Sequence, residues 1–267
     1  MRRPFRRPLR YPSVRVPFDP THLADCRLWL DSIDTNYLYQ ETTAPGTTLA
    51  NHNNDPVGTI RDRSQNAHHF TALANSNRAL LSLVGNKGKI IFDGTDDFFT
   101  GPTITGATGA CTMAVSWRFR NIPASTGGSI FLLKTGSNTW TEFTTINYSG
   151  YREITWSCDT TSTNTIFSVG CAGGLNTTSH RAVITYDGVN NASPTSYTLL
   201  LDGASQTVLT GGQFFRQSTD LTSLGGRWDG TTLTNSRDLN WDCLALWSGV
   251  KTAEQIAQID AWLLKHQ

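Results

Sequence analysis

Short apolar segments separated by Gly-, Asn- and Thr-rich stretches recur along the chain and predict a protein made almost entirely of β-strands. The clearest segment is Ile90–Phe92, a compact β-branched and aromatic run that is typical of a strand with a buried face. Asp93 and Gly94 should end it, because Asp accepts hydrogen bonds from the backbone ahead and Gly adopts a positive φ. We therefore predict a tight turn, after which Phe98 and Phe99 return to the core.

Alternation of apolar and polar residues predicts further strands. In Cys111–Phe119, four large apolar residues fall on one face, which indicates a half-buried strand. The other expected strands are 27–31, 67–71, 80–84, 129–133, 140–147, 152–156 and 166–169. A helical turn is expected at 22–25. Residues 37–57 and most of 157–179 are rich in small polar residues and are expected to be exposed loops and edges.

A helix is predicted near the end of the sequence. Thr252 followed by Gln255 fits a capping box, in which each side chain bonds the other residue's backbone N–H. Ile256, Ile259 and Leu263 then recur with helical spacing. We expect a short helix over Thr252–Leu264 that packs on the outside of the sheets through this apolar stripe.

The first twenty residues differ from the rest in composition. They contain five prolines, and the first fifteen contain six arginines and no acidic residue. Each proline fixes φ and removes a donor, so we expect an extended arm over 1–20 and a single β domain over 21–267. The chain carries a net charge of +1, but beyond residue 15 there are 16 basic and 21 acidic residues, a net charge of −5. A basic arm on an acidic body indicates a partner for the arm.

That partner is expected to be an acidic protein surface. Arginines can neutralise phosphates, but Phe5 and Tyr11 alone do not make the aromatic platform of single-strand nucleic-acid binders. A segment held open by proline loses less entropy on docking, and arginine forks pair well with carboxylates. The arm residues expected to contact the partner are Arg2, Arg3, Phe5, Arg6, Arg7, Leu9, Arg10, Tyr11 and Arg15.

Several segments occur in an order typical of one superfamily. They are Leu28–Asp31 with Asp34, Ile60–Ser64 with Asn66, Phe92-Asp93-Gly94 followed by Asp96-Asp97, His180–Asp187 followed by Tyr197–Gly203, and Leu239–Leu264. Together they resemble the laminin-G-like members of the concanavalin A-like jelly-roll superfamily. The resemblance implies an all-β, two-sheet antiparallel jelly-roll sandwich with an extended N-terminal arm and one short C-terminal helix.

Domains with this Trp-Leu-Asp opening and terminal helix resemble those carried on bacteriophage particles. The resemblance implies a non-enzymatic virion protein, either a head decoration subunit or a tail or fibre component, within a homo-oligomeric or icosahedral assembly. The arm would anchor the domain, which would face outward and bind glycans. Two alternatives stay open: a free-standing carbohydrate-binding module and a glycan hydrolase.

The acidic residues argue against hydrolysis. Jelly-roll glucanases place a Glu-x-Asp-x-x-Glu pattern on one strand so that two carboxylates flank a glycosidic bond. The four glutamates, none in such a pattern, are Glu41, Glu142, Glu153 and Glu254. The G-x-S-x-G, H-E-x-x-H and phosphate-loop patterns are also missing. We predict that the protein is not an enzyme.

Candidate ligand residues follow from the resemblance. Sugar binding in this superfamily commonly uses loop aromatics that stack on pyranose rings, with Asn or Asp beside them. The candidates are Trp140, Tyr148, Tyr151, Trp228 and Asp229. Glycines frame the Trp228–Asp229 pair as a loop, which makes it the best of them. The alternative for each aromatic residue is a place in the core or at a sheet edge.

The resemblance also raises a calcium site at Asp93, Asp96 and Asp97, completed by backbone carbonyls. The alternative, which we favour, is that Asp93 caps the turn and the other two carboxylates are solvated. No other cofactor is expected.

The five cysteines are odd in number and widely spaced, and they include no C-x-x-C pair. This pattern favours buried free thiols over disulfides or a zinc site. The basic start is not followed by the apolar core of a signal peptide, and no run approaches the ~20 apolar residues of a membrane span. We therefore expect a protein made in the host cytoplasm and located in the virion, without a membrane partner.

Overall fold

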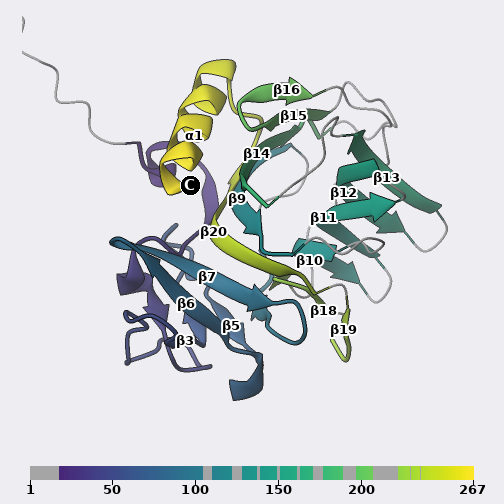
Figure 1. The fold of residues 1–267 in the computed structure, drawn as a ribbon. Coiled ribbons are helices and arrows are strands. Elements are labelled where there is room, and N and C mark those ends of the chain that lie inside the picture. The colour runs from purple at the N-terminus through teal and green to yellow at the C-terminus, as the bar shows by residue number, and fades with distance from the viewer. Residues whose placement is uncertain are drawn as a thin grey trace, which may run out of the picture.

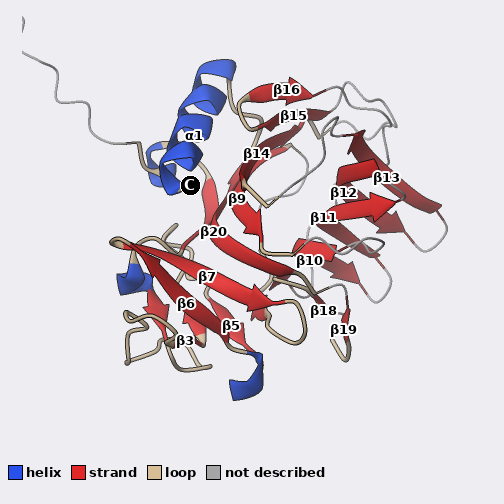
Figure 2. Cartoon of the chain, in the orientation of Figure 1, coloured by secondary structure: helices blue, strands red, loops and turns tan. Residues whose placement is uncertain are grey.

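The computed structural model describes residues 18–104, 110–121, 128–136, 139–148, 151–160, 163–170, 177–188, 197–206, 222–228, 230–234 and 236–267. For 132–142, 144–148, 151–160 and 163–170 the description covers the main chain only. Within these ranges the fold is two large antiparallel sheets that form a sandwich, with an α-helix on the outer face of one sheet (Figures 1 and 2). The predicted fold class is confirmed. The arm residues expected to dock lie outside the described residues.

The first sheet runs in the order β16 (Ala204–Gln206), β15 (Tyr197–Leu201), β14 (Ser179–Tyr186), β9 (Cys111–Phe119), β20 (Asp238–Ser248), β7 (Lys87–Asp93), β6 (Ala79–Val84), β3 (Pro56–Val57). Strand β1 (Cys26–Asp31) also pairs with β20. The second sheet runs β13 (Thr163–Gly170), β12 (Tyr151–Thr160), β11 (Thr139–Tyr148), β10 (Gly128–Gly136), β17 (Thr222–Leu224), β8 (Phe99–Gly101), β5 (Phe70–Ala72), β4 (Thr59–Ile60), β2 (Leu38–Tyr39).

The smaller elements complete the described chain. A separate hairpin joins β18 (Arg227–Trp228) to β19 (Leu233–Thr234). Three short 3₁₀ turns are η1 (Pro20–His22), η2 (Thr35–Tyr37) and η3 (Asn75–Asn77), and the helix is α1 (Ala253–His266). The helical turn predicted at 22–25 thus lies two residues earlier, because Asp19 caps it through the N–H of Thr21 and Pro20 occupies its first position.

Strand β20 organises the first sheet. It pairs with β9 along its length, while its other edge is shared: Asp238–Trp241 pair with β7, and Cys243–Trp247 pair with β1. A β-bulge between Trp241 and Cys243 places Asp242 at the point where the neighbour changes. The backbone N–H of Ser32, at the end of β1, donates to the carbonyl of Asp242 over 2.9 Å. At this bulge the partner on one edge of β20 changes from β7 to β1.

The main core lies between the sheets. Phe92, Val115, Trp117 and Leu246 are all fully buried. The indole of Trp117 meets the ring of Phe143 in β11 edge-on, with 5.4 Å between ring centroids. Since β9 and β11 belong to different sheets, this contact ties the two layers together.

A second core covers the outer face of the first sheet. Helix α1 packs there through Ile259, Trp262 and Leu263, over β9, β14 and β20. Thr112, Ala114 and Ser116 of β9 are consequently buried too, so the prediction of a half-buried strand at Cys111–Phe119 is wrong. The alternation in sequence is real, but a helix far along the chain covers the polar face.

Helix α1 begins as predicted. The Thr252 N–H donates to Gln255 Oε1 over 2.9 Å, and the Gln255 N–H donates to Thr252 Oγ1 over 3.3 Å. The helix is held down by Arg181 of β14, whose Nε lies 2.8 Å from Asp260 Oδ1. Because both side chains are mostly buried, this pair is stronger than a surface ion pair.

Some expected loops contain strands. Residues 157–160 continue β12, and β13 already begins at Thr163, because β-branched threonines suit a pleated edge as well as a loop. Within 37–57, both β2 and β3 form, each only two residues long. In 67–71 the strand starts only at Phe70, since His68 and His69 bond to other segments.

The segment Asp62–Asn66, with the pattern Asp-x-Ser-x-Asn, connects several parts of the fold through hydrogen bonds. Asp62 Oδ1 accepts the N–H groups of Trp29 (2.9 Å) and Ser64 (2.8 Å), and Asp62 Oδ2 accepts the N–H of His68 (3.0 Å). Asn66 Nδ2 donates to the carbonyl of Cys26 over 2.9 Å. One carboxylate therefore fixes the loop after β4 against β1, which explains the pattern without a ligand.

The cysteines whose side chains are described are free thiols, as predicted: Cys111 and Cys243 are buried and Cys26 is half-buried. Burial raises the pKa of the Cys26 thiol to about 12, so it stays protonated and unreactive near neutral pH. Cys158 and Cys171 fall outside that description. No helix in the described part of the chain is long and apolar enough to span a membrane.

The contact of Trp117 with the facing sheet gives a stability prediction. Trp117→Ala should lower the free energy of unfolding by about 3–5 kcal/mol, because it leaves a cavity between the sheets. Val84→Ala, at a side chain 60% exposed, should change it by about 0.5 kcal/mol or less. Denaturant unfolding measures both. A Trp117→Ala protein as stable as the Val84→Ala control would contradict the assignment of the core.

Candidate functional site

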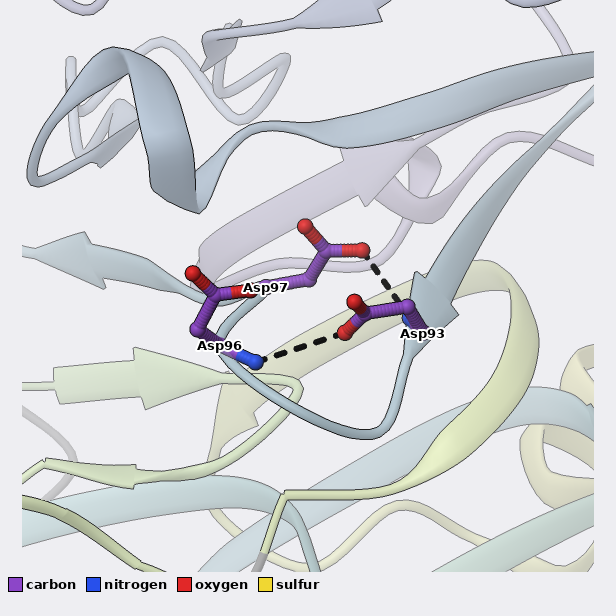
Figure 3. A group of neighbouring side chains, drawn as sticks. All are labelled: Asp93, Asp96 and Asp97. Carbon is purple, nitrogen blue, oxygen red and sulfur yellow. Dashed lines mark hydrogen bonds between the residues drawn. The ribbon is translucent and has the colours of Figure 1, made fainter.

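The turn after β7 brings the three predicted aspartates together (Figure 3). Asp93 Oδ1 accepts the N–H of Thr95 over 2.7 Å and that of Asp96 over 3.3 Å. Asp97 Oδ2 accepts the N–H of Asp93 over 2.9 Å. Gly94 has φ +78°, which few other residues adopt without strain. Local hydrogen bonding thus builds the turn that the sequence predicted.

The clustering of these carboxylates has an electrostatic cost. One carboxylate oxygen from each residue lies within 4.8 Å of the others. Asp93 and Asp96 are exposed, whereas Asp97 is buried. Burial, and then the negative charges of Asp93 and Asp96, raise the pKa of Asp97 to about 7.

The described residues do not complete a calcium cage. Calcium takes six to eight oxygen ligands, and the carboxylates of Asp93 and Asp97 already accept backbone hydrogen bonds. The carbonyl of Asp96 accepts from Asn77 Nδ2, and that of Thr95 from Ser236 Oγ. Asp93 caps the turn as predicted. The prediction that Asp97 is solvated is wrong, because its carboxylate is buried and accepts the N–H of Asp93. Calcium binding stays a prediction.

Trp228 lies beside this turn. It is half-buried in the β18–β19 hairpin, and its ring stacks on Phe98 with 5.1 Å between centroids and 27° between planes. Gly225, at φ +88°, lets the chain pass so close to Phe92 that a Cβ would clash with that ring. Phe98 directly follows Asp97, so the stack places the half-buried indole next to the aspartate turn. These residues are here called the Trp228 rim (Asp93, Asp96, Asp97, Phe98 and Trp228).

The sequence did not indicate that these two sets of candidates are neighbours. The sequence Asp96-Asp97-Phe98-Phe99 indicates that aromatic residues follow the aspartates. The hairpin that carries Trp228 comes next to them only because β17 pairs with β8. Phe98 was predicted only as a core residue, and it is buried. It was missed as the support for Trp228.

The main chain of the other aromatic glycan candidates lies on β11 and β12. Tyr148 and Tyr151 are register partners that close the β11–β12 hairpin, and Trp140 pairs with Asp159 at the other end of the same two strands. The description of these four residues stops at the main chain. Asp229 and the arm residues fall outside the described ranges, so their predicted roles stay predictions.

Two further charged pairs were not predicted. Lys89 Nζ lies 2.7 Å from Asp242 Oδ1 in the interior of the first sheet. His180 Nδ1 lies 2.8 Å from Asp202 Oδ2, which ties β14 to the turn between β15 and β16. Lys89 and Asp242 belong to two strands, and His180 and Asp202 to a strand and a turn, so no short motif marks either pair.

The comparisons with known proteins follow the fold. No protein-family model matches the chain, and no curated protein matches it. The structure is similar to domain 4 of AbnA, a GH43 extracellular arabinanase from Geobacillus stearothermophilus solved with arabinotriose. The TM-score is 0.57 at 10% identity, over 88% of this chain and 99% of that domain.

It is also similar to the binding domain of botulinum neurotoxin serotype D/C, with a TM-score of 0.58 at 12% identity over 93% of this chain and 53% of that one. For the Trypanosoma rangeli sialidase in complex with DANA, the TM-score is 0.51 at 11% identity, over 89% of this chain and 32% of the sialidase. The chain has the β-sandwich fold of these proteins. It spans only part of the neurotoxin domain and of the sialidase, and at these identities the likeness concerns the fold alone.

The raised pKa of Asp97 gives a prediction about pH. The unfolded chain loses this proton near pH 4 and the folded protein near pH 7, so stability falls as the pH rises through that window. Asp97→Asn keeps an acceptor for the Asp93 N–H and removes the charge. It should be more stable than the wild type at about pH 8, with the difference shrinking toward about pH 4. Thermal unfolding across this range measures it.

Asp96→Asn, at an exposed carboxylate, is the control and should largely keep the wild-type slope. If Asp97→Asn shows the same pH dependence as the wild type, Asp97 is ionised in the fold at neutral pH. Calcium bound by all three carboxylates would stabilise the wild type more than either variant, so a repeat with added calcium tests the metal prediction.

Proposed function

We propose that this protein is a non-enzymatic glycan-binding β-sandwich, carried on a virion as a head decoration or a tail or fibre component and anchored there by its N-terminal arm. The observation that carries the proposal is the Trp228 rim, a partly exposed indole beside a cluster of carboxylates, placed away from the root of the arm (Figure 1).

The chemistry of the rim suits a sugar. Ligand sites combine apolar or aromatic surface with a few polar groups that fix orientation. Phe98 stacks on the indole of Trp228 and limits its motion, so little side-chain entropy is lost on binding. The exposed carboxylates of Asp93 and Asp96 can accept hydrogen bonds from hydroxyl groups.

The root of the arm is fixed on the other side of the domain. Phe18 packs edge-on against Trp262 of α1, with 6.3 Å between ring centroids. Trp247 Nε1 donates to the carbonyl of Pro20 over 2.9 Å, and Lys251 Nζ donates to that of Ala24 over 2.9 Å. Figure 1 places α1 and the β18–β19 hairpin at opposite ends of the molecule. An anchor at the first would leave the second open to the surroundings.

The similar structures support the choice of ligand class. Domain 4 of the arabinanase was solved in complex with arabinotriose, and the binding domain of botulinum neurotoxin DC was solved in complex with SialylT. The virion part of the proposal rests on the resemblance to particle-borne domains and on the charge of the first fifteen residues, +6 against −5 for the rest of the chain.

The register of β11 and β12 supports a role without hydrolysis. Glu142 pairs with Ser157, and Glu153 pairs with Ile146, so the two glutamates are offset by four positions, about 13 Å along the strands. Glycosidase carboxyl groups lie about 5–9.5 Å apart. A free-standing lectin-like module is the second candidate, which a dispensable arm would favour, and a hydrolase is the third.

Glycan binding is tested with the purified full-length protein on an array of neutral, amino and sialylated glycans. Trp228→Ala should weaken binding to the best ligand at least about tenfold, or about 1.4 kcal/mol, while the protein stays folded and loses only the modest stability of the stack on Phe98. Tyr39→Ala, at another half-buried aromatic side chain, is the control. Loss of binding in Trp140→Ala but not in Trp228→Ala would move the site to β11. Release of reducing ends from the bound glycan would contradict the non-enzymatic role.

The arm is tested by deletion of residues 2–15. The shortened protein should fold and bind glycan as before, but should no longer sediment with the particles that carry the full-length chain. Attachment of the full-length protein should weaken as salt rises, because exposed charge pairs are screened. If the shortened protein attaches equally well, the arm is not the anchor.

A further inference from the structure

The buried pair of Lys89 and Asp242 is unusual in its depth. Lys89 Nζ lies 2.7 Å from Asp242 Oδ1, and the two side chains are 10% and 0% exposed. Lysine is almost never buried so completely, and burying two charges costs free energy that their attraction only partly returns. As an ion pair, Lys89 and Asp242 therefore add little net stability to the pairing of these strands.

The surroundings hold both groups in place and exclude water. Ile90 is the register partner of Trp241, so Lys89 and Asp242 are the next cross-strand neighbours after the last paired rung. Ser116 Oγ donates to Asp242 Oδ2 over 2.9 Å from the other neighbouring strand. The main-chain oxygen of Gln267, just after α1, lies 3.5 Å from Lys89 Nζ and helps to cover the site.

We propose that Lys89 and Asp242 condense into an intramolecular isopeptide bond between β7 and β20. In the ion pair, a proton passes from the Lys89 ammonium to the Asp242 carboxylate, giving an amine and a carboxylic acid. The Nζ lone pair attacks Cγ, the new N–C bond forms, and one carboxyl oxygen leaves with two protons as water. The products are a neutral amide and one water molecule, and nothing is oxidised or reduced.

The site offers what this reaction needs. The nitrogen already contacts the carboxyl group, so a small rotation brings it to the attack distance of about 3–3.5 Å from the carbon. Ser116 Oγ donates to the oxygen that becomes the oxyanion. Burial raises the pKa of the Asp242 carboxyl, against the opposing effect of the Lys89 charge, which favours the proton transfer. The amide product also removes both buried charges.

The proposal is independent of glycan binding and concerns only the chain itself. A covalent bond here would lock β7 to β20 directly beside the bulge where β1 takes over from β7. The first sheet could then not separate along this edge without breaking a covalent bond.

The test is the mass of the purified full-length protein. The denatured wild type should weigh one water molecule less than its sequence, and its digest should contain a branched peptide that joins Lys89 to Asp242. Lys89→Met should have the full sequence mass. Lys87→Met, which removes an amine from the same strand, should keep the branched peptide.

Loss of water alone is not sufficient, because succinimide formation at Asp93-Gly94 or Asp202-Gly203 also removes one water. Only the branched peptide distinguishes the isopeptide bond from a succinimide. Its absence from correctly folded wild type after prolonged incubation would overturn the proposal, whatever the variants do. Ser116→Ala should form the bond on the order of 100-fold more slowly, and equal formation would remove the hydroxyl from the mechanism.

Discussion

A β-strand can pair with one other strand along each of its two edges. The structure depends on how β20 divides one edge between two partners, β7 and β1. The bulge at Asp242 makes the exchange possible. It also leaves a carbonyl and a carboxylate inside the protein, where unpaired polar groups cost about 1–3 kcal/mol or more. Ser32 takes the carbonyl, and Lys89 and Ser116 take the carboxylate. The positions of β1 and β7 both follow from this junction.

The junction separates two structurally different regions. On the β1 side, Trp29 meets Trp262 of α1, and Phe18 packs on the same indole, so the helix and the root of the arm form one apolar block. On the β7 side, the strand ends at the aspartate turn and the Trp228 rim. Both strands are fixed to β20, so the two regions are joined through the same strand.

The sequence correctly predicted those features that depend on hydrogen bonds between residues close together in the chain. The Asp93-Gly94 turn and the Thr252–Gln255 cap were readable because each forms within a few residues. Contacts between distant segments were not readable. The second buried face of β9 depends on α1, and the stack of Trp228 on Phe98 depends on the pairing of separate strands.

The same limit applies to the candidate sites. The sequence identified the acids of the rim and its tryptophan separately, but not their adjacency. Lys89 and Asp242 are 153 positions apart, and each looks like an ordinary surface residue in its own segment. Threonine-rich stretches were misjudged for a different reason, because Thr is common both in loops and in exposed strands.

The distribution of tryptophan gives the molecule an optical property. Among the tryptophans whose side chains are described, Trp29, Trp117, Trp241, Trp247 and Trp262 are buried, and Trp228 is the partly exposed one. Buried indoles emit at shorter wavelengths and are shielded from dissolved quenchers, whereas an indole in contact with water is not. Among the tryptophans whose side chains are described, Trp228 is therefore the one expected to contribute to the red edge of the emission spectrum.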